Sequence, residues 1–236
     1  VAVKVEGRAR QLGVAVEILQ AAHFCPGRID AQRNNGQQQV HYPDAEIFPA
    51  AAGKGELQHA IFDTIIQWRP IEPKPSGRTV VVEIDDCSID HYRNQGEGGW
   101  PWGRQRHADL LDHLDRAGVR AVGYDVLFSD RSTHDPVGDA TLDAMADGGG
   151  GRFLFGSSRM HPDYDAGARL HASMVPAAFP LEAEPRRDPR VAMLLPYGEA
   201  MALFSAIANV TRNEDGVLRD IPLRETVGDW ALPSLP

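Results

Sequence analysis

Cysteine is scarce in this sequence. Only two of its 236 residues are cysteines, Cys25 and Cys87, and their spacing matches no zinc, haem or thiol-redox motif. Two free thiols are the favoured interpretation, and a single disulfide is the alternative if the chain folds in an oxidising compartment. The cysteines therefore predict no metal or haem site.

Long hydrophobic runs and excess positive charge are also missing. No run of about 18 apolar residues occurs, so the sequence itself contains no membrane-spanning segment. The chain has 24 Lys and Arg against 33 Asp and Glu, which gives a formal net charge of −9. Because such a field repels a phosphate backbone, we expect no nucleic-acid partner.

The sequence also lacks the short motifs of common catalytic centres. The stretch from Gly156 to Arg159, Gly-Ser-Ser-Arg, has no final glycine of a nucleophile elbow. The nine histidines include no His-Glu-x-x-His pattern, and no Gly-x-x-x-x-Gly-Lys phosphate loop occurs. We therefore expect no catalytic residue, no bound metal and no cofactor, and we do not expect an enzyme.

What is present is the composition of an ordinary folded domain. Apolar residues make up 42% and charged residues 24% of the chain, which is enough to build a core. Val1 is not an initiator residue, and the last residues, 230–236, stop inside an apolar pattern. These two features predict a fragment of a longer chain, with its targeting signals outside it.

The chain divides near residue 55. Residues 1–6 alternate like a strand, but residues 33–39 are polar and turn-rich and residues 50–55 resemble a linker. We therefore expect an N-terminal extension of uncertain structure over 1–55 and a domain over 56–236. The domain begins with a helix over 57–68, whose apolar residues share one face.

Beyond this helix the pattern predicts an α/β fold with a mixed, largely parallel sheet, flanking helices and a C-terminal β-hairpin. The β-branched run at 79–84 is typical of a strand covered on both faces, and with the helix and strand that follow it forms a βαβ unit. Residues 157–190 show little periodicity and predict a long excursion. The expected elements are strands at 79–84, 119–124, 152–155, 206–210 and 217–223, helices at 106–117, 138–145 and 197–204, and a hairpin turn at 213–216.

Acidic residues follow the strands of the βαβ unit. Asp85 and Asp86 come after the first strand and Asp125 after the second. If the strands are parallel neighbours, these carboxylates meet at the carboxyl edge, where open α/β sheets bind ligands. Two interpretations stay open, because such aspartates either bind a hard cation or cap turns and helices.

A tryptophan-rich loop lies between the two strands. Trp100, Pro101 and Trp102 form a stiff apolar lid, which either closes the edge of the core or stacks on a ligand. Arg104 and Arg106 follow directly and are expected to pair with one of the three aspartates. The lid and the acidic edge together form the predicted binding site.

Several of these motifs occur in an order that resembles the CHASE type 2 domain family, an extracytoplasmic sensory module of bacterial receptors. The resemblance covers residues 56–236. The family sits beside membrane helices and precedes cyclase or kinase output domains. The stretches that carry the resemblance are residues 57–68, 80–86, 100–104, His107 with Leu110 and Leu111, then 118–128 and 213–223, followed by 232–235.

The resemblance implies a periplasmic sensory input domain of a membrane-anchored bacterial signal-transduction receptor, at the periplasmic or extracellular face of the inner membrane. It implies an unidentified small-molecule signal or a protein partner, membrane attachment through segments outside this sequence, and room for a homodimer. Two alternatives stay open: a structural or assembly module of an envelope complex without a ligand, and a metal-dependent hydrolase at the acidic edge. The predicted ligand-binding residues are Asp85, Asp86, Trp100, Trp102, Arg104 and Asp125.

Overall fold

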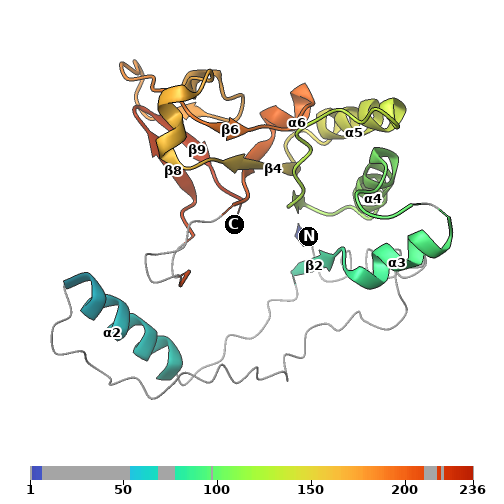
Figure 1. Cartoon of the computed structure of the whole chain (residues 1–236), viewed down its shortest axis with the longest axis horizontal. Coiled ribbons are helices and arrows are strands. Elements are labelled where there is room, and N and C mark those ends of the chain that lie inside the picture. Colours follow the sequence, from blue (N-terminus) through green and yellow to red (C-terminus); the bar gives the residue numbers. More distant parts are fainter. Residues whose placement is uncertain are drawn as a thin grey trace. The chain divides into compact units, whose positions relative to one another are not determined.

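The structure is a computed structural model that describes residues 2–6, 54–68, 78–96, 98–209, 217–218 and 221–235. The chain divides into two compact units. The larger unit consists of Val1–Pro26 and Gly77–Pro236, and the smaller unit consists of Gly27–Ser76. Figure 1 labels the α-helices and several of the strands.

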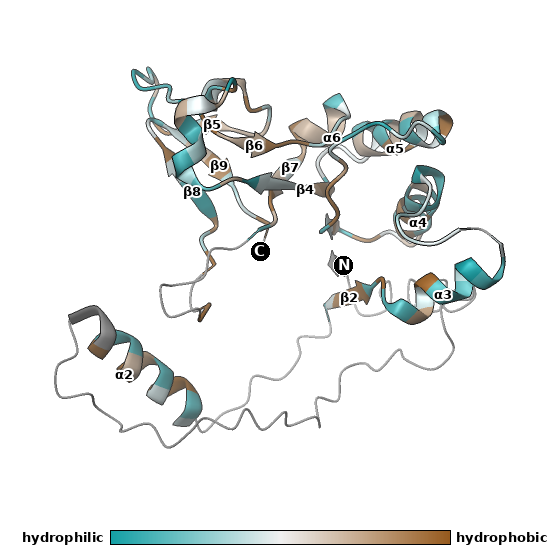
Figure 2. Cartoon of the chain, in the orientation of Figure 1, coloured by the Kyte–Doolittle hydropathy of each residue, from teal (hydrophilic) through white to brown (hydrophobic). Residues whose placement is uncertain are grey.

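In the smaller unit the structure describes one helix, α2 (Lys54–Trp68), which confirms the helix expected over 57–68. Its apolar side chains face solvent: Ile65 is 63% exposed and Trp68 is 79% exposed. Figure 2 shows hydrophobic and hydrophilic residues interspersed along it. Across the described part of the chain, no helix is long and apolar enough to cross a membrane.

The larger unit contains the α/β fold. Its elements, in chain order, are β1 (Ala2–Glu6), β2 (Thr79–Glu83), α3 (Asp86–Asn94), α4 (Arg104–Arg116), β3 (Ala121–Tyr124), α5 (Pro136–Gly148), β4 (Phe153–Arg159), the 3₁₀ turns η1 (Pro162–Gly167) and η2 (Ala172–Met174), β5 (Phe179–Pro180), β6 (Met193–Leu194), α6 (Glu199–Leu203), β7 (Ser205–Ile207), β8 (Arg224–Val227) and β9 (Trp230–Pro233).

A six-stranded mixed sheet organises this unit. Its order is β2-β1-β3-β4-β6, and β7 also pairs with β4. Strands β2, β3, β4 and β7 run in one direction, whereas β1 and β6 run against them. A separate sheet has the order β5-β9-β8. The expected α/β fold with a mixed, largely parallel sheet is confirmed.

The two strands of the expected βαβ unit are not neighbours, which corrects one step of the sequence argument. Strand β1 lies between them, and its Val3 pairs with Val82 of β2 on one side and with Tyr124 of β3 on the other. The alternation of residues 1–6 predicted a strand correctly. The pattern could not name the strand's partners, because pairing is set by tertiary contacts. The proposed boundary at residue 55 stays a prediction.

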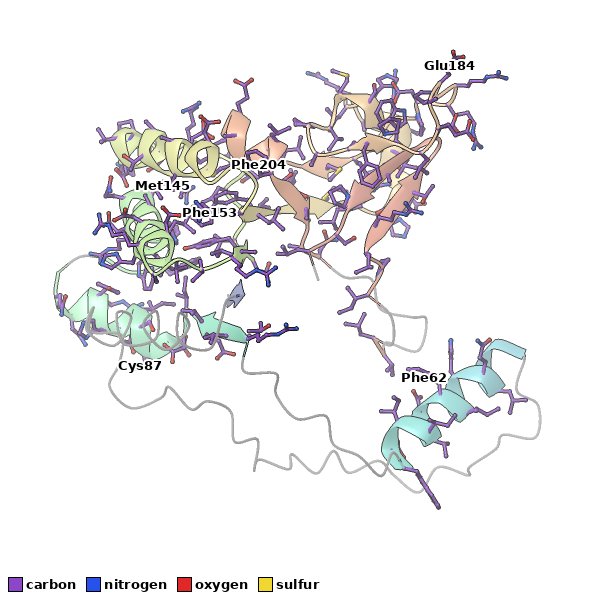
Figure 3. The ribbon with its side chains drawn as sticks, turned by 180° about the vertical axis from the view of Figure 1, so that it is seen from behind. Phe62, Cys87, Met145, Phe153, Glu184 and Phe204 are labelled. Atoms are coloured by element: carbon purple, nitrogen blue, oxygen red, sulfur yellow. The ribbon has the colours of Figure 1, made fainter. Side chains whose placement is uncertain are left out.

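The main core lies where α4, α5 and α6 pack against β3 and β4. Ala108, Leu111 and Leu114 line the buried face of α4 and meet Leu142 of α5. Phe153, at the start of β4, is fully buried in the same cluster. Figure 3 shows the side chain of Phe153 near Met145 of α5 and Phe204, which follows α6. Figure 1 places these three helices together beside β4.

Residues 157–190 do not form the structureless excursion that the sequence predicted. They contain the end of β4, then η1, η2 and β5, and pack around a second hydrophobic cluster. Leu232 of β9 and Ile207 of β7 belong to that cluster. The segment therefore has its own core, built against strands that come much later in the chain. Periodicity within the segment could not reveal this, because the partners lie outside it.

The C-terminal hairpin is present but lies further along the chain than expected. It is formed by β8 and β9, with a turn at Gly228 and Asp229, and Gly228 has a φ of 61°. The strand expected over 217–223 is wrong for its described residues, 217–218 and 221–223, which are not in a strand. Pro222 has no N–H to donate, which agrees with this outcome. The expected turn at 213–216 lies outside the described residues.

Candidate functional site: the carboxyl edge of β2 and β3

Asp85 caps a helix that the sequence did not predict. Its Oδ1 accepts hydrogen bonds from the Ser88 N–H at 2.8 Å and the Ser88 hydroxyl at 2.7 Å, and α3 starts at the next residue. Asp86 is exposed in the first turn, where a negative charge is favourable. The capping interpretation therefore describes Asp85. The Asp-x-x-Ser spacing was a signal for this helix start.

Asp125 follows β3 and is exposed. It lies at the same edge of the sheet as Asp85, but β1 stands between the two parent strands. Two strand spacings separate positions on β2 and β3 by about 10 Å. Among the described residues, no group of three or more His, Cys, Asp or Glu side chains is placed to hold a metal ion.

The tryptophan lid is partly buried. Trp102 is 6% exposed, whereas Trp100 is 37% exposed. The Trp102 ring contacts Tyr92 of α3 edge-to-face, with centroids 5.0 Å apart, and Trp100 at 5.7 Å. Trp102 thus closes the edge of the core, as one of the two interpretations held. Trp100 keeps part of its ring available to solvent and to a ligand.

His107 lies beneath this lid. It is buried in α4, the helix that the sequence predicted over 106–117. Its Nδ1 is 2.7 Å from the hydroxyl oxygen of Tyr124, also buried. Burial, reinforced by the neighbouring Arg104 and Arg106 cations, lowers the pKa of His107 from 6.5 to about 4. The imidazole is therefore neutral at pH 7.

Arg104 pairs with a different carboxylate from those expected. Its Nε lies 3.4 Å from Oδ1 of Asp139 in α5, and both side chains are largely buried. Its Nη2 donates to the carbonyl oxygen of Asp130 at 3.2 Å, and the guanidinium stands 4.7 Å above the Phe128 ring. The prediction that Arg104 pairs with Asp85, Asp86 or Asp125 is therefore wrong. The packing of α4 on α5 brings Asp139 closer, and sequence spacing gave no sign of it.

Asp135 is a residue that the site prediction missed. One carboxylate oxygen accepts from the backbone N–H of Gln105 in α4 at 2.9 Å, and the other accepts from Gly138 in α5 at 2.9 Å. The hydrogen bond from Gln105 leads the interactions that lower the pKa of Asp135. This carboxylate therefore joins the starts of two helices beside the lid. The Asp135-Pro136 pair signalled a helix start, but only for α5.

Cys87 lies on α3 directly after the acidic edge (Figure 3). It is disulfide-bonded, so the favoured interpretation of a free thiol is wrong for Cys87. The sequence has one other cysteine, Cys25, which lies outside the described residues. The spacing of the cysteines in the sequence could not show whether Cys87 is bonded, because a disulfide requires two Cα atoms to approach within about 7 Å in the fold.

A second polar centre, far from the predicted site in sequence, surrounds Arg159 at the end of β4. Its guanidinium donates to both carboxylate oxygens of Asp165, at 2.8 and 2.6 Å, and to Glu225 of β8 at 2.9 Å. The carbonyl oxygens of Met160 and Ala192 accept further hydrogen bonds from it. These partners come from segments that pack around the second hydrophobic cluster, and we call these segments together the second lobe. Arg159 therefore joins the segments of this lobe.

The fold and the site together describe the class of protein. It is an α/β domain with a mixed sheet, and an aromatic lid closes the acidic carboxyl edge of that sheet. A family model, the CHASE2 domain, matches residues 47–236, so the chain belongs to the CHASE2 domain family, and the resemblance stated from the motifs is confirmed. CHASE2 domains are extracellular or periplasmic sensor modules of signalling receptors. No curated protein and no solved structure matches the chain.

Proposed function

We propose that this chain is the periplasmic sensory input domain of a membrane-anchored bacterial signal-transduction receptor and that it is not itself an enzyme. The observation that carries this proposal is the CHASE2 match over residues 47–236. In the proposed receptor, membrane segments outside this sequence anchor the domain at the periplasmic face of the inner membrane. A signal binds one of two conformations more tightly and so shifts the equilibrium between them.

The disulfide at Cys87 supports the proposed compartment. Disulfides form and persist in oxidising environments such as the periplasm and are rare in the cytosol. The excess of 9 negative charges supports a partner that is neither a nucleic acid nor another polyanion. Compartment and charge thus agree with a sensor outside the cytoplasm.

The proposed signal site is the edge formed by Asp85, Asp86, Asp125 and the lid, Trp100 and Trp102. Asp86, Asp125 and part of Trp100 are open to solvent, and they offer two carboxylates and an aromatic face. Asp85 caps α3, and Trp102 contacts Tyr92 of the same helix. These two residues therefore hold α3 at this edge.

Arg104 belongs to the proposed site as a positioning residue. Its hydrogen bond to the carbonyl oxygen of Asp130 and its ion pair with Asp139 hold the loop that follows β3. The accessible groups favour a small organic cation, because carboxylates and an aromatic face both attract positive charge.

A ligand screen by thermal shift tests this site on the purified chain. A library of amines, amino acids and quaternary ammonium compounds is screened with wild type, Asp125→Asn and Trp100→Ala. Asp147→Asn, an exposed position near the end of α5, is the matched control. A true site ligand loses about tenfold or more in affinity in both site variants and none in the control. A ligand that binds all four chains equally rejects the site.

An exposed apolar face favours a protein partner as the second candidate. Leu57, Ile61, Ile65 and Trp68 of α2 are each at least 43% exposed, and an isolated helix of this length is marginal in water. An assembly module or a homodimer would cover this face. Analytical ultracentrifugation of wild type and Ile65→Lys measures it. A concentration-dependent dimer that the substitution abolishes favours this candidate, and a monomer at all concentrations rejects the homodimer.

A further inference from the structure

The lid covers a buried histidine. His107 is 2% exposed, and four aromatic rings surround it with centroids between 5.1 and 6.2 Å: those of Trp100, Trp102, Tyr124 and Phe128. Only Trp100 among these rings is substantially exposed. Water therefore reaches the imidazole most directly through displacement of the lid.

The surroundings of His107 favour its neutral form. Burial raises the pKa of Tyr124 well above its ordinary value, so its hydroxyl keeps its proton and can donate to Nδ1. The Nε2 atom is buried and has no hydrogen-bond partner among the described residues. An imidazolium carries a proton on both ring nitrogens. With Tyr124 donating to Nδ1, the neutral ring already carries its proton on the unpaired Nε2. Protonation would add Nδ1–H, which displaces the Tyr124 proton from its acceptor, and would place a positive charge in an apolar surround, which is costly.

The charges around His107 act in the same direction. Arg104 and Arg106 lie on the same helix and disfavour a third positive charge. Asp139 from α5 faces Arg104 and offsets that cation, not the imidazole. Tyr124 is the titratable group from β3. Tyr92 of α3 contacts Trp102, and the Arg106 guanidinium lies 4.0 Å from the centroid of the Tyr92 ring.

We propose that His107 is an acid-sensitive latch: uptake of a proton by its imidazole releases the lid formed by Trp100 and Trp102, so that acid is itself a signal for this domain. Once the lid is released, water reaches Nε2 and the carboxyl edge is uncovered. Since Trp102 contacts Tyr92, the movement also frees α3 from the lid. This inference rests on the sensory function proposed above.

Hydrogen–deuterium exchange at pH 7 and pH 4, corrected for the intrinsic pH dependence of exchange, tests the latch. The lid peptide, residues 98–107, is expected to open about 100-fold more often at pH 4, because an open lid exposes a histidine of ordinary affinity for protons. The rise is expected in wild type and in the control His113→Gln, a more exposed histidine of the same helix. It is expected to vanish in His107→Gln.

Three results would overturn the latch. The first is an equal rise in His107→Gln, and the second is simultaneous opening of β4, residues 153–159, which would mean global unfolding. The third is an NMR titration of the His107 ring in wild type with a midpoint near 6.5. This last measurement needs no variant, so it decides the question even where His107→Gln fails to fold.

The latch and the ligand site fail separately. A ligand that depends on Asp125 at pH 7, together with an unresponsive lid at pH 4, would reject the latch and keep the site. A responsive lid without any ligand that depends on Asp125 and Trp100 would keep the latch and reject the site.

Discussion

Asp85 and Asp135 illustrate how single carboxylates act in this chain. Asp85 caps α3, and Asp135 caps α5 while also accepting from the start of α4. Each carboxylate therefore satisfies backbone N–H groups that would otherwise lack partners at helix starts. An aspartate at a strand end is thus a weak sign of a ligand site until its backbone partners are known.

His107 gives a prediction about stability and pH. Its pKa is about 4 in the folded chain and near 6.5 in an unfolded one. The unfolded state therefore binds more protons between these values, so stability is retained above pH 6.5 and is lost as pH falls toward 4. The loss from this residue is about 3 kcal/mol. Urea unfolding at several pH values should show a steeper decline for wild type than for His107→Gln.

His113→Gln serves as the reference for that comparison. It leaves His107 and its surroundings unchanged, so its stability should fall with pH in parallel with that of wild type. Parallel curves for wild type and His107→Gln would contradict the expectation.

At the scale of elements, α4 and α5 approach each other closely at their starts. A Cβ atom at Gly138 would lie 2.2 Å from Oδ2 of Asp135 and 2.5 Å from the backbone nitrogen of Gln105. Glycine is therefore required at this position by space rather than by backbone angle. At Gly148, the last residue of α5, a Cβ would meet nothing within 4 Å.

These two glycines form a matched pair of substitutions in one helix. Gly138→Ala should destabilise the fold by about 1–3 kcal/mol, because the Asp135 bridge must move. Gly148→Ala should be neutral or stabilising by about 0.5–1 kcal/mol, because alanine loses less backbone entropy in a helix. Thermal unfolding followed by circular dichroism measures both. Equal effects at the two positions would show that Asp135 does not join the helices.

At the scale of the whole molecule, Arg159 links segments that are far apart in sequence. Its side chain is 6% exposed and reaches Asp165, Glu225 and the carbonyl of Ala192. Arg159→Met should cost about 3–4 kcal/mol, since it leaves two carboxylates without their cation. Arg190→Met, which removes one hydrogen bond to the Ala166 carbonyl, should change stability by less than about 0.5 kcal/mol. Denaturant titration of both variants checks this difference.

The disulfide gives a second prediction at this scale. Reduction should lower stability by about 2–4 kcal/mol, because it releases a constraint on the unfolded chain. Thermal unfolding with and without dithiothreitol measures the change, and Cys87→Ser should behave like the reduced wild type. Titration of the denatured, unreduced chain should find no free Cys87 thiol. A reactive thiol there would contradict the bonded state.

The sequence by itself predicted the elements whose signal is local. The β-branched run of β2 and the helix expected over 106–117 depend on neighbours within one or two turns. Gly118, with a φ of 70° just after the α4 cap, ends that helix. The same local patterns supplied the motifs of the CHASE2 family. They also offered Trp102 as a residue that closes the edge of the core, where the structure buries it.

Only the tertiary structure decided which of these elements meet. It inserted β1 between β2 and β3, paired Arg104 with Asp139 instead of the strand-end aspartates, and turned residues 157–190 into a lobe around Arg159. The physical reason is the same in each case. Periodicity records which side of an element is apolar, whereas partners are chosen by packing and by the pairing of buried polar groups across the whole fold.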